Sequence, residues 1–443
     1  MVNDLTTVIN EIASEKKKLY YKGFCLDDSL ASIKYLKSFG IYPENRWENI
    51  AKIFVGVIYK SFRRKKMTIQ SAGTLYQKKI LVAINFPADD RRHSKILLDF
   101  VFNYPMKGDI VVFTNQKSIY EICKNDTITC VYIINPLFNY DFNSLFKGYT
   151  YKESLTLNNF KNYIDVLPKY LDQTNVKLIL TTQDVLRPDY NYAIIGKKQG
   201  LTTVTHQHGS IPDADKTLYS LLTSDYMLVW GESSKRNLMR SISPERLKVV
   251  GTTKFNRDSK NTKFEGVSKG ILITPTIEPF EPQKKIIEKL LFELKEFSNI
   301  SIKLHPMHNY KKWKAFIEVL MSESKASNKI QIIQGFKETI YFEFEILINM
   351  NSSSYLEGLL GEISIIELDL NRELSTPIKS IKESYVAVEN TAKEILNRLN
   401  NPEYSASIIK KQNELLKQDL ASTGLELEYS FINELLSKQP DDR

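Results

Sequence analysis

The chain has 443 residues, and its 42% hydrophobic and 26% charged content is ordinary for a globular protein of two or three domains. This composition excludes a predominantly disordered chain. Lys and Arg outnumber Asp and Glu by 61 to 52, and the net charge of +9 suits phosphorylated substrates or an anionic surface. Spread over this length, the charge is too small to favour nucleic acid as the partner.

The amino-terminal sequence shows no targeting signal. Residues 1–18 lack the apolar core of a secretory signal, and no later run reaches the roughly 20 apolar residues that cross a bilayer. The three cysteines, Cys25, Cys123 and Cys130, have no CxxC spacing, which favours reduced thiols over disulfides or a zinc ribbon. These features predict a cytoplasmic protein.

Residues 1–75 are rich in charge and poor in short β-type runs, and we expect a helical amino-terminal extension there. Within it, residues 51–66 join an apolar block to a basic end. Such a segment can rest on an anionic membrane surface, where a lipid-linked acceptor would be presented. It equally fits a core helix with a solvated basic tip, and the sequence leaves both interpretations open.

The pattern changes at residue 76 and holds to residue 255. Short β-rich runs appear, most of them continuously apolar, as in strands buried on both faces of a parallel sheet. Helical patterns at 156–172 and 188–199 separate several of these runs, which predicts a doubly wound α/β domain. The runs lie at 78–86, 109–114, 129–135, 177–182, 201–209, 226–231 and 247–251.

The same alternation restarts after a polar connector at 251–270 and continues to residue 400. The second set of apolar runs lies at 271–276, 300–306, 330–335, 344–354 and 363–368. Two α/β domains facing a cleft are therefore predicted, followed by a helical segment and tail at 401–443. Ligands of such sheets bind beyond the carboxyl ends of the strands, so the candidate site residues are those directly after each strand.

His305 follows a predicted strand in the second half, within Lys303-Leu304-His305-Pro306. Pro306 keeps the preceding residue extended, so the imidazole is presented at the strand end, with Lys303 close in sequence. An imidazole there can bind a phosphate oxygen or act as an acid toward a leaving phosphate. A surface histidine in a strand-to-helix turn explains the same pattern, and the dipeptide alone does not decide between them.

Ser352, Ser353 and Ser354 follow another strand and open a predicted helix. Serine hydroxyls and the N–H groups of a helix start can hold an anion without a cation. Ser354 and Glu357 also have capping-box spacing, so one serine can be structural and Glu357 can be either its cap partner or a ligand of a ribose hydroxyl. Thr276 ends a third strand at the same predicted sheet edge.

His206, His208 and Gly209 end a strand in the first half. Alternate residues of an extended segment share a face, so the two imidazoles are expected to point together, as a base or acid facing His305 across the cleft. A buried His206 beside a functional His208 is the preferred interpretation, with Gly209 allowing a sharp turn or close ligand approach. A metal site needs more ligands, and the chain has five histidines and no HExxH pattern. We therefore expect no metal and no cofactor.

Three common enzyme motifs are missing from the sequence. It has no GxGxxG, no Walker lysine loop and no GxSxG elbow. Dinucleotide redox chemistry, P-loop hydrolysis and serine esterase chemistry therefore lose support.

Six short motifs follow one another in the chain: HQHG at 206–209, YMLVWG at 226–231, VVGTTKFNRD at 249–258, a Pro-Thr loop at 275–276, KLHP at 303–306 and SSS at 352–354. Their order and spacing resemble the GT-B enzymes of bacterial capsule and wall-polymer synthesis. This group holds CDP-glycerol and CDP-ribitol phosphotransferases, polysialyltransferases and capsular Kdo transferases. The resemblance covers roughly residues 175–370.

The resemblance implies a GT-B-like fold with two Rossmann-like domains, an acceptor domain at 76–255 and a nucleotide-donor domain at 256–400. It implies metal-independent transfer of a sugar or polyol phosphate from a nucleotide-activated, cytidine-type donor to a glycan or lipid-linked acceptor. By the same resemblance His305 and the three serines bind the donor phosphates, with Thr276 near them, and His208 deprotonates the attacking hydroxyl.

The chain also departs from these relatives. Its first half lacks the paired acidic residues and glycine of the polysialyltransferases, and Asn349 to Asn351 stand where wall-polymer transferases usually carry an aspartate. The choice between sugar and polyol phosphate stays open. A UDP-sugar 2-epimerase is an alternative, with Asp184, Asp189 and Asp213 as its candidate acids in the first half. A non-catalytic binding protein of polysaccharide assembly is another.

Overall fold

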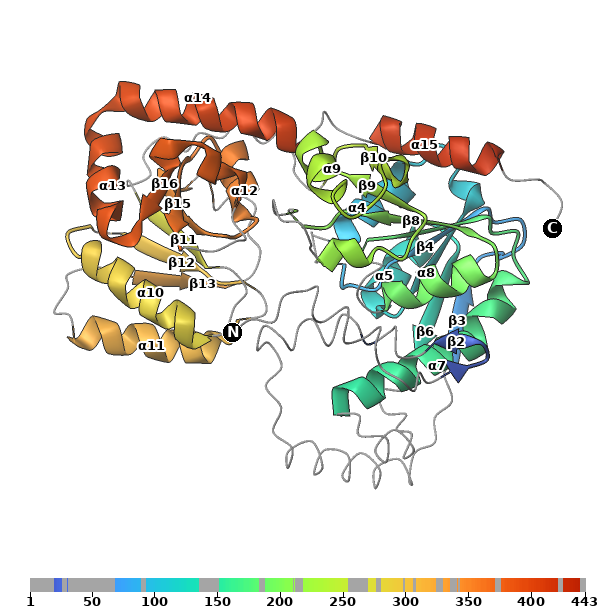
Figure 1. Cartoon of the computed structure of the whole chain (residues 1–443). Coiled ribbons are helices and arrows are strands. Elements are labelled where there is room, and N and C mark those ends of the chain that lie inside the picture. Colours follow the sequence, from blue (N-terminus) through green and yellow to red (C-terminus); the bar gives the residue numbers. More distant parts are fainter. Residues whose placement is uncertain are drawn as a thin grey trace.

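The computed structural model contains two large β-sheets, each made mainly of parallel strands and flanked by helices (Figure 1). The residues it describes are 20–25, 30, 68–88, 93–134, 151–182, 188–209, 211, 218–253, 270–275, 280–297, 299–305, 308–323, 330–334, 341, 343–370, 376–420 and 425–438.

The first sheet has eight strands, and seven of them are parallel. The exception is β3, which pairs antiparallel with β6 at one edge. From one edge to the other the order is β10 (Leu247–Val249), β9 (Tyr226–Val229), β8 (Thr202–His206), β7 (Leu178–Thr181), β4 (Ile80–Ala83), β5 (Ile110–Thr114), β6 (Cys130–Ile134) and β3 (Thr68–Ala72).

Helices bury both faces of this sheet, which explains why its central strands are apolar throughout. One face packs against α4 (Ser94–Asn103), α5 (Lys117–Asn125) and α15 (Leu425–Ser437). The other face packs against α7 (Tyr151–Leu171) and α8 (Asp189–Lys198). The short helix α9 (Glu232–Leu238) follows β9 and packs near the β10 edge.

The second sheet has six strands, all parallel. Numbered along the chain its order is 3-2-1-4-5-6, the order of the dinucleotide-binding Rossmann sheet. The strands are β13 (Ile330–Ile333), β12 (Ile300–Lys303), β11 (Ile271–Pro275), β14 (Ile346–Met350), β15 (Ser364–Asp369) and β16 (Tyr385–Ala387).

Two groups of helices cover the second sheet. One face carries α10 (Phe280–Glu293), α11 (Tyr310–Glu323) and α13 (Thr391–Asn400). The other carries α12 (Ser354–Leu360) and α14 (Pro402–Asp419).

The last two helices connect the domains, and Figure 1 shows α14 running from the second domain to the first. The backbone oxygens of Gln418 and Asp419 lie 2.5 Å from where a Cβ on Gly231 would sit, just before α9. Trp230 joins the apolar cluster of the second domain together with Leu420. Helix α15 then packs against the first sheet, so α14 and α15 together contribute to both domains.

Two described parts of residues 1–75, at 20–25 and 68–72, form strands where the sequence predicted helices. Strands β1 (Tyr20–Tyr21) and β2 (Phe24–Cys25) form a hairpin, and β3 is part of the first sheet. β3 was missed because an antiparallel edge strand need not be continuously apolar, and its TIQSA sequence is mostly polar. The basic segment 51–66 lies outside the described residues.

Candidate functional site

Each sheet has one point where the strand order reverses, between β4 and β7 in the first and between β11 and β14 in the second. At such a point the connections on the two sides diverge and leave a crevice outside the carboxyl ends of the strands. Both points are lined by polar side chains, although the strands that lead to them are apolar.

In the second sheet, a hydrogen bond crosses this point. Thr274 Oγ1 on β11 donates to Asn349 Oδ1 on β14 over 2.8 Å, and both side chains are buried. The Asn349 amide also donates to Glu367 Oε2 on β15, at 2.6 Å, and to the carbonyl of Ser352, at 3.0 Å. Three neighbouring strands are thereby tied together at their carboxyl ends.

The serine turn follows β14 directly. Asn351 has a left-handed backbone with φ of 57°, and its N–H donates to Glu367 Oε1 at 2.8 Å. Ser352 Oγ lies 3.1 Å from Ser354 Oγ and accepts from the Ser354 N–H at 3.3 Å. Ser352 and Ser353 are partly exposed at the start of α12, whereas Ser354 is buried.

The capping box that the spacing of Ser354 and Glu357 suggests is not formed. The residue before α12 is Ser353, which makes no side-chain cap hydrogen bond, and Ser354 lies inside the helix. Glu357 is partly exposed on the same short helix, one turn beyond the serines. The serine turn is instead built by Glu367 and Asn349.

His305 lies two residues beyond β12 and is partly exposed. Its N–H donates to His308 Nδ1 at 3.1 Å, and its carbonyl accepts from the His308 N–H at 2.9 Å. This turn lies just beyond the strand end. Lys303, in contrast, is buried, with its ammonium 5.5 Å from the centre of the Tyr341 ring. Thr276 and Pro306 lie outside the described residues.

In the first sheet, His208 lies two residues beyond β8. Its Nδ1 is 3.2 Å from the carbonyl oxygen of Thr182, which follows β7. The Tyr219 hydroxyl is 3.2 Å from Nδ1 and 3.4 Å from Nε2. Because a carbonyl only accepts hydrogen bonds, this contact favours the tautomer with the proton on Nδ1 and makes Nε2 the basic nitrogen.

His93 stacks against His208 at the same edge. Their ring centres are 4.8 Å apart with an angle of 29° between the planes, and His93 also stacks on Phe86 at 3.9 Å. Phe86 follows β4 and His93 precedes α4, so the stack spans the point where the strand order reverses. The His208 imidazole is therefore packed against the rings of His93 and Tyr219.

A buried carboxylate holds the backbone next to His208. Asp189, at the start of α8, accepts from Asn85 Nδ2 at 2.7 Å and from the Thr182 N–H at 3.3 Å. Asp189 is 1% exposed. It therefore fixes the Thr182 backbone whose carbonyl faces His208. Asp184 and Asp213, the other candidate acids, lie outside the described residues.

His206 and His208 do not point together, and that prediction is wrong. His206 is 1% exposed, and its Nε2 lies 3.0 Å from Glu428 Oε1 on α15. Alternation fails because β8 ends at His206 and the chain turns at the buried Gln207. The Gln207 amide bonds to the Gly209 carbonyl, to Ser234 and to the Trp230 N–H.

The turn at Gly209 does not depend on a left-handed glycine. Its backbone is outside the left-handed region, and a Cβ there would meet only the Tyr219 hydroxyl, at an ordinary 3.5 Å. The turn is held by the Gln207 side chain and by the Gly209 N–H, which donates to the Tyr219 hydroxyl at 3.2 Å.

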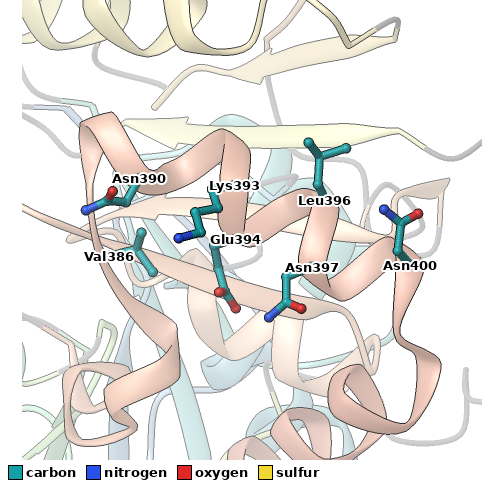
Figure 2. A pocket seen from close by; sticks show the side chains of 7 residues that line it. All are labelled: Val386, Asn390, Lys393, Glu394, Leu396, Asn397 and Asn400. Atoms are coloured by element: carbon teal, nitrogen blue, oxygen red, sulfur yellow. The ribbon is translucent and has the colours of Figure 1, made fainter.

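Two surface pockets of the described residues lie away from these edges. The larger, about 700 Å³, is formed by α13 and the end of β16 (Figure 2). Its lining residues are Val386, Asn390, Lys393, Glu394, Leu396, Asn397 and Asn400. A pocket of about 310 Å³ lies at the opposite, amino-terminal edge of the first sheet, beside Lys79 and Lys177. Neither contains the polar clusters described above, so the site rests on those clusters.

Among the described residues, no group of three or more His, Cys, Asp or Glu side chains is placed to hold a metal ion. None of the helices in the described ranges combines the length and the apolar character needed to cross a membrane.

No protein-family model and no curated protein matches the sequence. Solved structures do. A glycosyltransferase from Rickettsia africae is 15% identical with a TM-score of 0.53, over 82% of this chain and 99% of that one. HepE of Anabaena in complex with UDP-glucose is 11% identical with a TM-score of 0.52, over 82% and 100%. The UDP-GlcNAc 2-epimerase of Neisseria meningitidis bound to UDP-GlcNAc is 16% identical with a TM-score of 0.52, over 82% and 100%.

The fold is GT-B-like. Identities this low establish the architecture and not the reaction. Within this GT-B-like architecture, the two points of strand reversal are the sites that general α/β topology favours for ligands.

Several site residues were missed in the sequence. His93 and Tyr219 both contact His208. His93 lies far before His208 in the chain and Tyr219 lies 11 residues after it, and no pattern in the sequence links either of them to it. Glu367 lies in the middle of an apolar run that was correctly predicted as a strand. A charged residue inside such a run is the one signal that pointed to a buried polar role.

Proposed function

We propose that this protein is a glycosyltransferase, or a polyol-phosphate transferase, that uses a nucleotide-activated donor without a metal ion. The observation that carries the proposal is the contact between His208 Nδ1 and the Thr182 carbonyl. It leaves Nε2 as a base at the carboxyl edge of the first sheet. The serine turn at the corresponding edge of the second sheet, and the GT-B-like fold, support the same conclusion.

The donor is assigned to the second domain. Ser352 and Ser353 offer hydroxyls and backbone N–H groups at the start of α12, and His305 adds an imidazole from the neighbouring β12 edge. Thr276 completes this set by resemblance. Such donors stabilise charge that grows on a leaving phosphate. Glu357 is assigned to the ribose hydroxyls. Lys303 is left out, because its buried ammonium faces Tyr341.

The acceptor is assigned to the first domain, and His208 is the general base. His208 Nε2 takes the proton of the acceptor hydroxyl while that oxygen attacks. With a sugar donor the attacked atom is the anomeric carbon and the nucleoside phosphate leaves. With a polyol-phosphate donor the attacked atom is phosphorus and the nucleoside monophosphate leaves. The Thr182 carbonyl stabilises the imidazolium by accepting its Nδ1–H.

A finer assignment is also proposed: a cytidine-type donor and a glycan or lipid-linked acceptor in capsule or other surface-polysaccharide synthesis. It rests on the resemblance of the HQHG, KLHP and SSS motifs. The protein would act in the cytoplasm, where such donors are made, or at the inner face of the membrane.

The first test is a thermal-shift panel with CMP, CDP, UDP and GDP. A ligand that binds only the folded state at 100 times its Kd adds about 2.7 kcal/mol of stability. We expect one nucleotide to stabilise the wild-type protein, and Ser352→Ala to reduce that shift. Asn397→Ala, in the pocket of Figure 2, serves as the control and is expected to keep the full shift. A panel in which none of the four nucleotides stabilises the protein contradicts the proposal.

A second assay separates transfer from epimerisation. The protein is incubated with UDP-N-acetylhexosamine alone, with and without EDTA. The transferase proposal expects no epimer. Epimer formed without an acceptor would favour the 2-epimerase alternative. In a separate assay with donor and acceptor both present, transfer that is lost in EDTA and restored by one divalent ion would overturn the metal-independent mechanism.

A further inference from the structure

Glu367 is the centre of a buried hydrogen-bond network in the second domain. Its side chain lies on β15, is 0% exposed, and accepts from three donors. These are the Asn349 amide at 2.6 Å, the Asn351 N–H at 2.8 Å and the Thr376 hydroxyl at 2.9 Å. Because Asn349 also accepts from Thr274, one carboxylate links the neighbouring strands β11, β14 and β15.

Two of these bonds fix the turn that contains the serines. Asn351 has φ of 57°, a conformation that costs most L-residues roughly 1–2 kcal/mol and that asparagine tolerates best. Its N–H is held by Glu367 Oε1, while the Asn349 amide that contacts Oε2 also holds the Ser352 carbonyl. The turn is therefore clamped on both sides of its left-handed residue.

Burying this carboxylate has an energetic cost. Burial raises the pKa of Glu367 to about 7, against the hydrogen bonds from Asn349, Thr376 and Asn351, which lower it. An apolar residue in the middle of β15 would avoid this cost, as the neighbouring Ile366 and Leu368 do. A buried acid at a ligand-binding sheet edge is more consistent with a role in shaping the site than with stability.

Resting on the transferase function proposed above, we propose that Glu367 is a positioning residue of the donor site. It holds Asn351 and Asn349 so that the turn at Ser352–Ser354 keeps the shape that receives the donor's phosphates. It acts through the turn and does not touch the donor itself.

The test compares Glu367→Gln with Gln412→Leu at pH 8, where the carboxylate is ionised. Gln412 is the matched control because it is also buried and forms hydrogen bonds to the backbone of Ile365 on the same strand. It also donates to the hydroxyl of Ser384. Two quantities are measured: the affinity for UDP and CDP by calorimetry, and the hydrogen exchange of peptides covering 349–356.

We expect Glu367→Gln to weaken nucleotide binding on the order of 10-fold, because small displacements of binding groups have large effects. We also expect faster exchange in the turn. Gln412→Leu is expected to lower stability and leave both quantities unchanged.

A second pair of variants keeps the test valid where Glu367→Gln fails to fold. Thr376→Ser retains the hydroxyl donor and is expected to bind nucleotide like the wild type. Thr376→Val removes the donor and is expected to bind several-fold more weakly, about 3-fold or more.

The outcomes separate this inference from the function it rests on. Unchanged affinity and unchanged exchange in Glu367→Gln overturn the inference, as does an equal loss of affinity in Gln412→Leu. A wild-type protein that binds none of the four nucleotides overturns the proposed function instead. The exchange of the 349–356 peptides then decides by itself whether Glu367 holds the turn.

Discussion

The carboxyl edges of the two sheets share a plan and differ in chemistry. In each, a buried carboxylate accepts from an asparagine amide and from a backbone N–H that follows a strand: Asp189 from Asn85 and Thr182, Glu367 from Asn349 and Asn351. In the first sheet the backbone so fixed carries the carbonyl that faces His208. In the second it carries N–H groups and hydroxyls. In the proposed function, the same arrangement prepares a base on one side and an anion-binding turn on the other.

The largest expected effect is on catalysis at the first edge. His208→Ala is expected to reduce turnover by at least about 100-fold, which is the scale of a lost general base. The reason is that the hydrogen bond to the Thr182 carbonyl, which leaves Nε2 free to act as the base, is lost with the imidazole. Thermal unfolding should change little, since the side chain is only partly buried. Turnover within a few-fold of the wild type would remove His208 from the mechanism.

The neighbouring histidine provides the contrast. His206→Ala removes the partner that lies 3.0 Å from the buried Glu428, and it is expected to lower the free energy of unfolding by on the order of 3 kcal/mol. Turnover per folded molecule should remain close to that of the wild type. Chemical denaturation and single-temperature kinetics on both histidine variants check this. A His206 variant that is stable yet inactive would contradict the division between the two residues.

Gly231→Ala tests how tightly the end of α14 packs against the first domain. A methyl group at this position meets the backbone oxygens of Gln418 and Asp419 at 2.5 Å, and backbone cannot rotate away. We expect a loss of stability of about 1–3 kcal/mol. A substitution to alanine at Gly108, which has nothing within 4 Å of the added atom, is the control. Equal stability of the two variants would show that the contact at α14 yields easily.

A further expected effect is the pH dependence of stability that Glu367 contributes. Its pKa rises from 4.5 when exposed to about 7 when folded, chiefly through burial. Between these values the folded protein keeps a proton that the unfolded chain has lost, so stability falls as the pH rises through this window and is level above it. The contribution is on the order of 3 kcal/mol. Glu367→Gln should flatten the curve of unfolding free energy between pH 4.5 and 7, and parallel curves for both proteins would contradict the raised pKa.

Much of the fold could be predicted because buried parallel strands are locally distinct. Runs such as 109–114 and 271–276 are apolar throughout, and the structure places β5 and β11 there. In the two large sheets, the missed strands are β3 and β16. Both lie at sheet edges, where one side is not enclosed and the residues need not be apolar.

The site was only partly predictable for a related reason. His305 and the serines could be proposed from the sequence because each lies just beyond the end of its own strand. His93 joins His208 by stacking, and Glu367 reaches the serine turn from a neighbouring strand. These contacts depend on which strands are adjacent in the sheet, and the strand order cannot be predicted from the local periodicity of apolar residues. The predicted direction of the His206 side chain is wrong for another reason: β8 ends at His206, three residues before the end of the predicted run at 201–209.

The most direct test of the account is a hydrogen-exchange map of the wild-type protein with and without the nucleotide that stabilises it best. We predict protection in peptides that cover 303–305 and 349–357, with little change in 386–400, the segment around the pocket of Figure 2. Protection confined to 386–400 would contradict the assignment of the donor to the carboxyl edge of the second sheet.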